Sequence, residues 1–128
     1  MFRMVKVRDK VKIYCKGKTV EVEALFDTGS GKSYISENVA EKLTYEPYDK
    51  PREIQLAIKN FKAKIIAYIP AVDLEITGCV LPSKETLDVI KDLYVDAIIG
   101  LNIIEPYGIT FEKDMIKFRE YPPRTHLI

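Results

Sequence analysis

The sequence predicts a mainly β domain with one or two short helices, and three observations lead to this prediction. Apolar and polar residues alternate over several stretches, as they do in strands that bury one face. Short turn sequences such as Lys16-Gly17-Lys18 separate these stretches. Of the 128 residues, 47% are hydrophobic and 30% charged, which is the balance of one globular domain with its own core. We therefore treat residues 1–128 as one domain, with residues 119–128 as a tail.

The first hairpin is predicted around Lys16-Gly17-Lys18. Alternation runs from Lys10 up to this turn and resumes after it as far as Phe26. Its apolar positions are Val11, Ile13, Cys15, Val20, Val22, Ala24 and Phe26. The second strand then leads directly into Asp27-Thr28-Gly29-Ser30-Gly31. A short helix is expected next, because Ser36 is a suitable N-cap for residues 37–43.

Two further hairpins are predicted in the middle of the chain. One has its tip near Lys59-Asn60, because apolar and polar residues alternate both before and after these two residues. The other turns around Thr77-Gly78. The stretch from Ser83 to Leu93 is expected to be a helical turn or a long connection, because its apolar residues have a helical spacing. These residues are Leu87, Ile90 and Leu93. Strand patterns return from Ala97 to Phe118.

Charge and cysteine content narrow the classes of function. Lys and Arg total 20 against 19 Asp and Glu, so the net charge of +1 gives no basic footprint for nucleic acid. The most apolar window, Ile65 to Val72, is too short to span a bilayer. Cys15 and Cys79 form no CxxC pair and have one histidine, His126, to join them, which disfavours a metal site. The chain is therefore expected to be cytoplasmic, with reduced thiols.

Two segments could carry chemistry together. Asp27 follows the apolar strand residues Ala24-Leu25-Phe26 and precedes a hydroxyl residue and a glycine, so its carboxylate emerges where a strand ends. About 70 residues later, Ala97-Ile98-Ile99 forms a second apolar strand that ends in Gly100. Because glycine lets two backbones approach closely, this strand could pass directly beneath the acidic turn.

These two motifs together resemble the retropepsin-like aspartic proteases. That family has two apolar residues before Asp-Thr/Ser-Gly-Ser/Ala and later two apolar residues before Gly, as in Leu25 to Ser30 and Ile98 to Gly100. The resemblance extends roughly from Val11 to Phe118 and implies a closed β-barrel of the acid protease fold. It also implies that Asp27 is the catalytic carboxylate of an endopeptidase that acts on polypeptides without a metal or an organic cofactor.

The resemblance further implies a homodimer. Aspartic proteases need two carboxylates that share one proton, whereas this chain has one Asp-Thr-Gly and is too short for two lobes. The site would form where two Asp27 side chains meet across the dimer axis. The chain ends, Met1 to Val7 and Ile116 to Tyr121, would interleave into an interface sheet. The shared proton predicts best activity at acidic to mildly acidic pH.

Supporting roles follow residue by residue from the same resemblance. Thr28 would bond to the backbone of the partner chain, Gly29 would let the two turns approach, and Ser30 would support Asp27. Ile99 and Gly100 would buttress the turn from below. The flap that closes over a substrate would be Gln55 to Ile65, which has no glycine at its tip. Its substrate-contacting residues would be Ala57, Ile58, Lys59, Asn60 and Phe61.

Other interpretations compete with this one. Asp27 could simply be a turn residue, since Asp-Thr-Gly-Ser suits turns anywhere. Gly29 to Ser33 looks like the end of a phosphate-binding loop, but Phe26 stands where that loop needs its first glycine. A dehalogenase-like phosphatase needs a second acid at position 29, which is glycine. The main alternative is a catalytically inactive dimeric module of the same fold that binds peptides or proteins.

Overall fold

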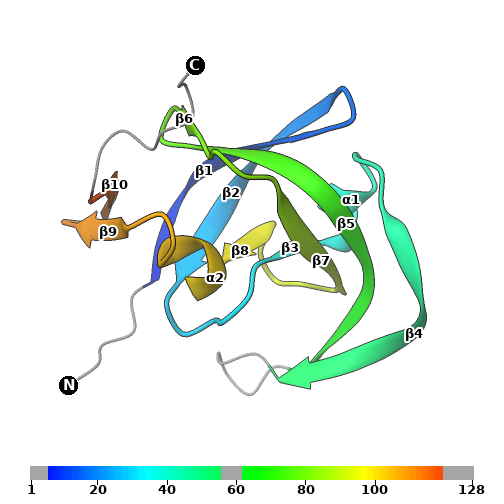
Figure 1. Ribbon diagram of the computed structural model, residues 1–128. Coiled ribbons are helices and arrows are strands. Elements are labelled where there is room, and N and C mark those ends of the chain that lie inside the picture. Colours follow the sequence, from blue (N-terminus) through cyan, green and yellow to red (C-terminus); the bar gives the residue numbers. More distant parts are fainter. Residues whose placement is uncertain (1–5, 56–61, 120–128) are drawn as a thin grey trace.

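The computed structural model describes residues 6–55 and 62–119. Figure 1 shows that most of this part of the chain is strand, with two single-turn helices. The elements are β1 (Lys6–Cys15), β2 (Lys18–Asp27), β3 (Tyr34–Ser36), α1 (Glu37–Ala40), β4 (Glu46–Gln55), β5 (Lys62–Ile76), β6 (Cys79–Val80), β7 (Glu85–Lys91), β8 (Ala97–Ile99), α2 (Leu101–Ile104), β9 (Ile109–Glu112) and β10 (Met115–Phe118). The predicted mainly β class is confirmed.

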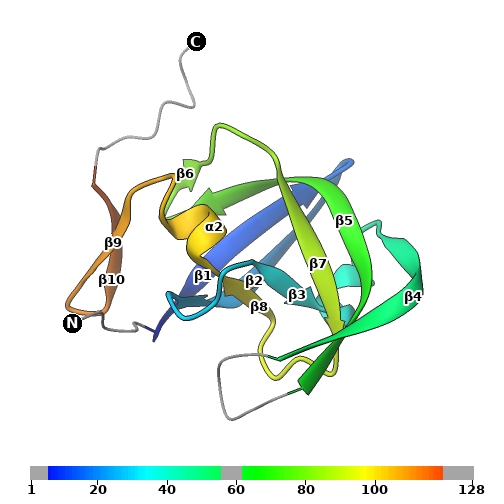
Figure 2. The same cartoon turned by 60° about the horizontal axis from the view of Figure 1, so that its bottom comes forward.

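The main sheet closes into a barrel. Its strands follow the order β1-β2-β8-β3-β7-β5, and β1 also pairs with β5, which joins the two ends of the series. Strand β4 adds to β5 outside this ring, and β6 also pairs with β5. In the two views of Figures 1 and 2, β4 and the separate β9–β10 hairpin lie on opposite sides of the barrel. The closed barrel predicted from the family resemblance is therefore confirmed.

Tight turns form where the sequence predicts them. In the β1–β2 hairpin Cys15 pairs with Lys18, and the two residues between them have φ of 49° and 80°. Positive φ at both central residues is typical of a type I′ turn, whose twist matches that of the strands. Thr77 and Gly78 repeat these values between β5 and β6. The β4–β5 hairpin is also present, and its tip lies outside the described residues.

The prediction for Ser83 to Leu93 is wrong, because residues 85–91 form strand β7. This strand pairs with both β3 and β5, so it lies inside the barrel wall. Leu87 and Val89 point to the main core cluster, whereas Ile90 belongs to a second cluster on the other face. A strand that buries both faces loses the strict alternation that would distinguish it from a helix.

Both helices are single turns. The α1 helix begins as predicted after Ser36, whose hydroxyl accepts a hydrogen bond from the Val39 N–H at 3.2 Å. It ends at Ala40, earlier than the predicted residue 43, although Leu43 is still buried. The α2 helix starts directly after Gly100. Among the described residues, no helix has the length and apolar character that a membrane crossing requires.

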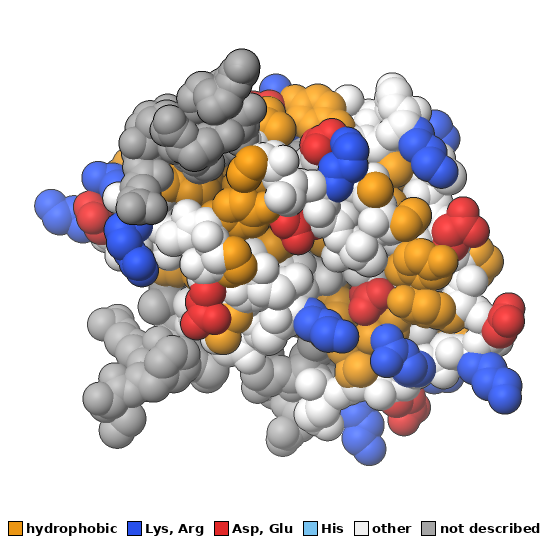
Figure 3. Space-filling model, in the orientation of Figure 1, with side chains coloured by type: hydrophobic (Ala, Val, Ile, Leu, Met, Phe, Trp, Pro, Cys, Tyr) orange, Lys and Arg blue, Asp and Glu red, His pale blue; other side chains and the backbone are white. Residues whose placement is uncertain are grey.

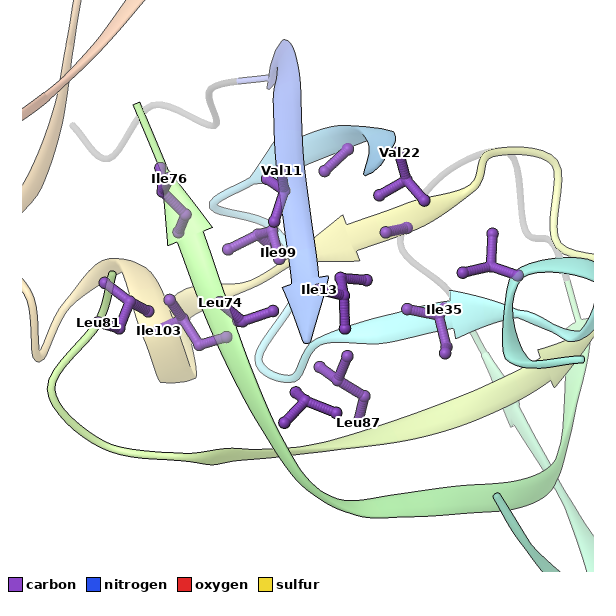
Figure 4. Close-up of a cluster of buried hydrophobic side chains, with 14 of the residues drawn as sticks. Val11, Ile13, Val22, Ile35, Leu74, Ile76, Leu81, Leu87, Ile99 and Ile103 are labelled. Carbon is purple, nitrogen blue, oxygen red and sulfur yellow. The ribbon is translucent and has the colours of Figure 1, made fainter. Parts of the chain in front are cut away.

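Two apolar clusters stabilise the barrel. The larger one fills the space enclosed by β1, β5, β8 and β3, where Figure 4 shows side chains such as Ile13, Leu74 and Ile99 pointing inward. The second cluster consists of Leu25, Tyr34, Ala63, Ile65, Ile90, Val95 and Ile98. Cys15 is buried, Cys79 is half-buried, and both are free thiols. On the face seen in Figure 3, acidic and basic side chains are interspersed and form no single-sign patch.

Candidate active site

Parallel pairing of β2 with β8 brings the two sequence motifs together. Leu25 is paired with Ile98 and Phe26 with Ile99, although each pair is separated by more than 70 residues. β2 ends at Asp27 and β8 ends at Ile99, so Asp27 and Gly100 directly follow the last paired residues and lie side by side. The site therefore lies where two parallel apolar strands of the barrel end side by side.

Asp27 lies at the start of a tight turn and is almost completely buried, with 2% of its surface exposed. The Gly29 N–H donates a hydrogen bond to its carboxylate oxygen Oδ1 at 2.8 Å. The Ser30 N–H donates to the Asp27 backbone carbonyl at 3.1 Å, which closes the turn. A buried carboxylate needs donors of this kind, because burial without them is costly.

The segment that begins at Gly100 lies directly against this turn, as Figure 2 shows for α2 and the loop between β2 and β3. The Leu101 N–H donates to the Ser30 carbonyl at 2.7 Å, and the Asn102 N–H donates to the Gly31 carbonyl at 3.2 Å. A Cβ atom on residue 100 would collide with the carbonyl oxygens of Lys32 and Ser30. This is the close backbone approach that the glycine at the end of β8 predicts.

The other predicted support residues lie around the same turn. Thr28 and Ser30 are half-buried, and Ile99 is packed in the larger core cluster below. The Ser30 hydroxyl donates to the Lys32 carbonyl at 2.7 Å, so Ser30 contacts Asp27 through its backbone N–H and not through its side chain. The predicted flap residues 57–61 lie outside the described part of the chain.

Sequence reasoning missed one buried side chain at the site, Ser33. Its hydroxyl accepts a hydrogen bond from the Gly100 N–H at 2.9 Å and donates one to the Asn102 side-chain oxygen at 2.7 Å. Asn102 lies two residues after the second motif, and the sequence does not assign it this contact. No local pattern could have singled out Ser33, because both of its partners come from the far end of the chain.

A cavity of about 520 Å³ opens beside the site. It is lined by Lys6, Val7, Arg8, Leu25, Tyr94 and Asp114. These residues include two cationic side chains and one carboxylate, so the lining has a net positive charge. Arg8 is 3.6 Å from Glu23, but both side chains are more than half exposed, which makes this ion pair weak.

Tyr94, which lines this cavity, has a phenol whose pKa is raised. Burial raises the pKa of the Tyr94 phenol above its ordinary value, and the negative charge of Asp27 raises that pKa further. The positive charge of Arg8 acts in the opposite direction.

The structure also bears on the rejected phosphate-binding loop. Such a loop ends at the N-terminus of a helix, whose N–H groups bind the phosphates. Here Ser33 is followed by strand β3, and the loop amides of Gly29 and Ser30 already donate to Asp27. In the ranges 6–55 and 62–119, no group of three or more His, Cys, Asp or Glu side chains is arranged to hold a metal ion.

Comparisons with known proteins point to one family. The family model described as aspartyl protease matches residues 10–103, which include both motifs. The chain is also similar in structure to the retroviral protease-like domain of Ddi1 from Leishmania major, with a TM-score of 0.63. That match covers 91% of this chain and 90% of the other, at 18% sequence identity. No sequence match was found among the curated proteins.

Proposed function

The chain belongs to the aspartyl protease family and has a retropepsin-like fold, and from this premise we propose that it is a homodimeric aspartic endopeptidase. The observation that supports the proposal most is the geometry of Asp27. A carboxylate with 2% exposure stands at the end of β2, accepts a hydrogen bond from Gly29 and lies beside the Gly100 turn. A turn residue without a role in chemistry would be expected to place its carboxylate in solvent.

The chemistry needs a second carboxylate, which a second copy of the chain would supply. Two carboxylates held close together share one proton, because both cannot ionise at that separation. The ionised Asp27 would take a proton from a water molecule, whose oxygen attacks the peptide carbonyl carbon. The protonated Asp27 of the other copy would donate its proton to the carbonyl oxygen. The first Asp27 then passes the proton that it took from water to the peptide nitrogen, while the second Asp27 regains a proton from a hydroxyl of the tetrahedral intermediate. The C–N bond breaks, new carboxyl and amino ends are released, and the pair again shares one proton.

The substrate would be a polypeptide bound in an extended form. Backbone hydrogen bonds to an extended peptide are largely independent of its sequence, whereas side-chain pockets give specificity. In this proposal the cavity beside the site would receive a substrate side chain near the cleaved bond. Since water is the nucleophile and the carboxylates handle both protons, we expect no cofactor and best activity at acidic to mildly acidic pH.

Cleavage of an unbiased peptide mixture, followed by mass spectrometry at acidic pH, tests the proposal. Wild-type protein should generate new peptide ends, and Asp27→Asn should generate none while remaining a dimer by light scattering. The Asn side chain keeps the size of Asp but cannot act as the base. No cleavage by a wild-type sample shown to be dimeric would overturn the proposal and favour the peptide-binding module. Equal cleavage by both proteins would assign the activity to a contaminant.

A further inference from the structure

The Ser33 hydroxyl occupies a position between the two motifs of the site. Ser33 is 3% exposed, and its oxygen accepts the Gly100 N–H while its proton goes to the Asn102 side chain. A hydroxyl that both accepts and donates is fixed in orientation by its two partners. Gly100 is itself buried, so its N–H needs an acceptor in the protein.

This hydroxyl completes a set of contacts that are otherwise made by backbone. The Leu101 and Asn102 N–H groups reach the carbonyls of Ser30 and Gly31. The three consecutive N–H groups of residues 100–102 therefore donate to Ser33, Ser30 and Gly31, respectively, and of these three acceptors only the one on Ser33 is a side-chain atom. A substitution at Ser33 can thus weaken the contact between these two segments without altering the Asp-Thr-Gly sequence.

The same turn carries the donor to the candidate carboxylate. Gly29 is four residues before Ser33, and its N–H points at Asp27 Oδ1 at 2.8 Å. If residues 30–33 shift away from Gly100, the Gly29 N–H is no longer held at hydrogen-bond distance from the Asp27 carboxylate. We propose that Ser33 is a positioning residue, which through Gly100 and Asn102 holds the turn that orients Asp27. The catalytic part of this inference rests on the proposed protease function.

Ser33→Ala is the primary variant, and Ser36→Ala is its matched control. Both serines are buried. Ser33 precedes β3 and lies next to the Asp27 turn, whereas Ser36 is the last residue of β3 and its hydroxyl caps α1. Ser33→Ala should lower kcat by about tenfold or more with KM within about twofold, because displacement of a reacting group affects mainly the chemical step. Ser33→Thr, which keeps the hydroxyl, and Ser36→Ala should both retain kcat within about threefold.

A second measurement does not depend on proteolysis. Hydrogen exchange of the Gly29 amide, followed by NMR, reports directly on its bond to Asp27. Ser33→Ala should accelerate this exchange about tenfold or more, and Ser36→Ala should leave it close to wild type. Asn102→Ala, which changes an exposed residue, should have the same direction of effect with less risk to folding.

The two measurements separate failure of this inference from failure of the proposed function. Faster Gly29 exchange in Ser33→Ala supports the positioning role even if the wild-type protein cleaves nothing, in which case the protease proposal fails alone. An unchanged Gly29 exchange rate in a folded Ser33→Ala protein overturns the inference. Cleavage by the wild type with an unchanged kcat in Ser33→Ala also overturns it. An equal loss of kcat in Ser36→Ala would show that the loss in Ser33→Ala comes from lower stability in general, and would also overturn the inference.

Discussion

The backbone of Gly100 passes so close to the active turn that a Cβ atom built on it would lie 2.6 Å from the carbonyl oxygen of Ser30. Real Cβ atoms do not approach backbone oxygens this closely, and the backbone cannot move without breaking the hydrogen bond from Leu101. We expect Gly100→Ala to lower the free energy of unfolding by about 1–3 kcal/mol or more. Urea unfolding measures this change.

The matched control for that prediction is Gly31→Ala. A Cβ atom on Gly31 has nothing within 4 Å, and its φ lies outside the positive range that disfavours other residues. The free energy of unfolding of Gly31→Ala should stay within about 0.5 kcal/mol of wild type or rise slightly, because alanine reduces the conformational freedom of the unfolded chain. Similar losses in both variants would show that glycine is needed for flexibility at the turn, not for close approach.

Mixing chains tests whether both copies supply Asp27. Equal amounts of wild-type and Asp27→Asn chains, allowed to exchange partners, should give about one quarter of the activity of the same total amount of wild type. If each chain worked alone, the activity would be about one half. Peptide cleavage is measured before and after exchange. Mixing with Glu21→Gln, an exposed position near the other end of β2, should leave the activity unchanged.

Alkaline pH should destabilise the protein partly through Tyr34. Burial, and secondarily the charge of Asp88, raises the pKa of its phenol above the ordinary value of 10.0. Above about pH 10 the unfolded chain therefore loses this proton first, so the free energy of unfolding falls as pH rises until the folded phenol also ionises. Below that range the contribution is fully present.

Comparing wild type with Tyr34→Phe isolates this contribution. The difference in their free energies of unfolding should be constant at neutral pH, and the alkaline decline should be shallower in the variant, by at most about 1.4 kcal/mol per pH unit. Denaturant titrations at several pH values provide the measurement. Parallel curves for the two proteins would show that Tyr34 is as easily ionised in the fold as in the open chain.

The net positive cavity beside Asp27 predicts a preference for acidic side chains near the cleaved bond. Arg8→Gln should reduce kcat/KM for a peptide with Glu at that position by roughly two- to fivefold, a small effect because the Arg8 side chain is half exposed. The matched peptide with Gln should be cleaved at an unchanged rate. Lys84→Gln, which removes a cation outside this cavity, serves as the control. Equal losses on both peptides would contradict a charge effect.

Local patterns predict the fold well where one face of a strand is buried. The turns at Lys16-Gly17 and Thr77-Gly78, and the cap at Ser36, depend on neighbouring residues and can be found from the sequence. Strand β7 cannot, because its two buried faces hide the alternation of period two. The barrel closure by β1 and β5 follows only from family resemblance, since no local signal encodes it.

The candidate site is predictable in part for the same reason. Asp27 and Gly100 carry recognisable motifs, so the sequence alone indicates that they lie close together. Ser33 and Tyr94 carry none, and their importance depends on which distant residues the fold brings to them.

The parallel pairing of β2 with β8 also determines when the site can exist during synthesis. Parallel neighbours cannot be joined by a tight turn, and here the connection includes most of the barrel. A nascent chain that stops before Ala97 has an Asp-Thr-Gly turn but lacks the strand, the glycine and the amides that hold it. Incomplete chains on the ribosome should therefore have no organised acid at Asp27, which delays any hydrolytic activity until almost the whole barrel has been made.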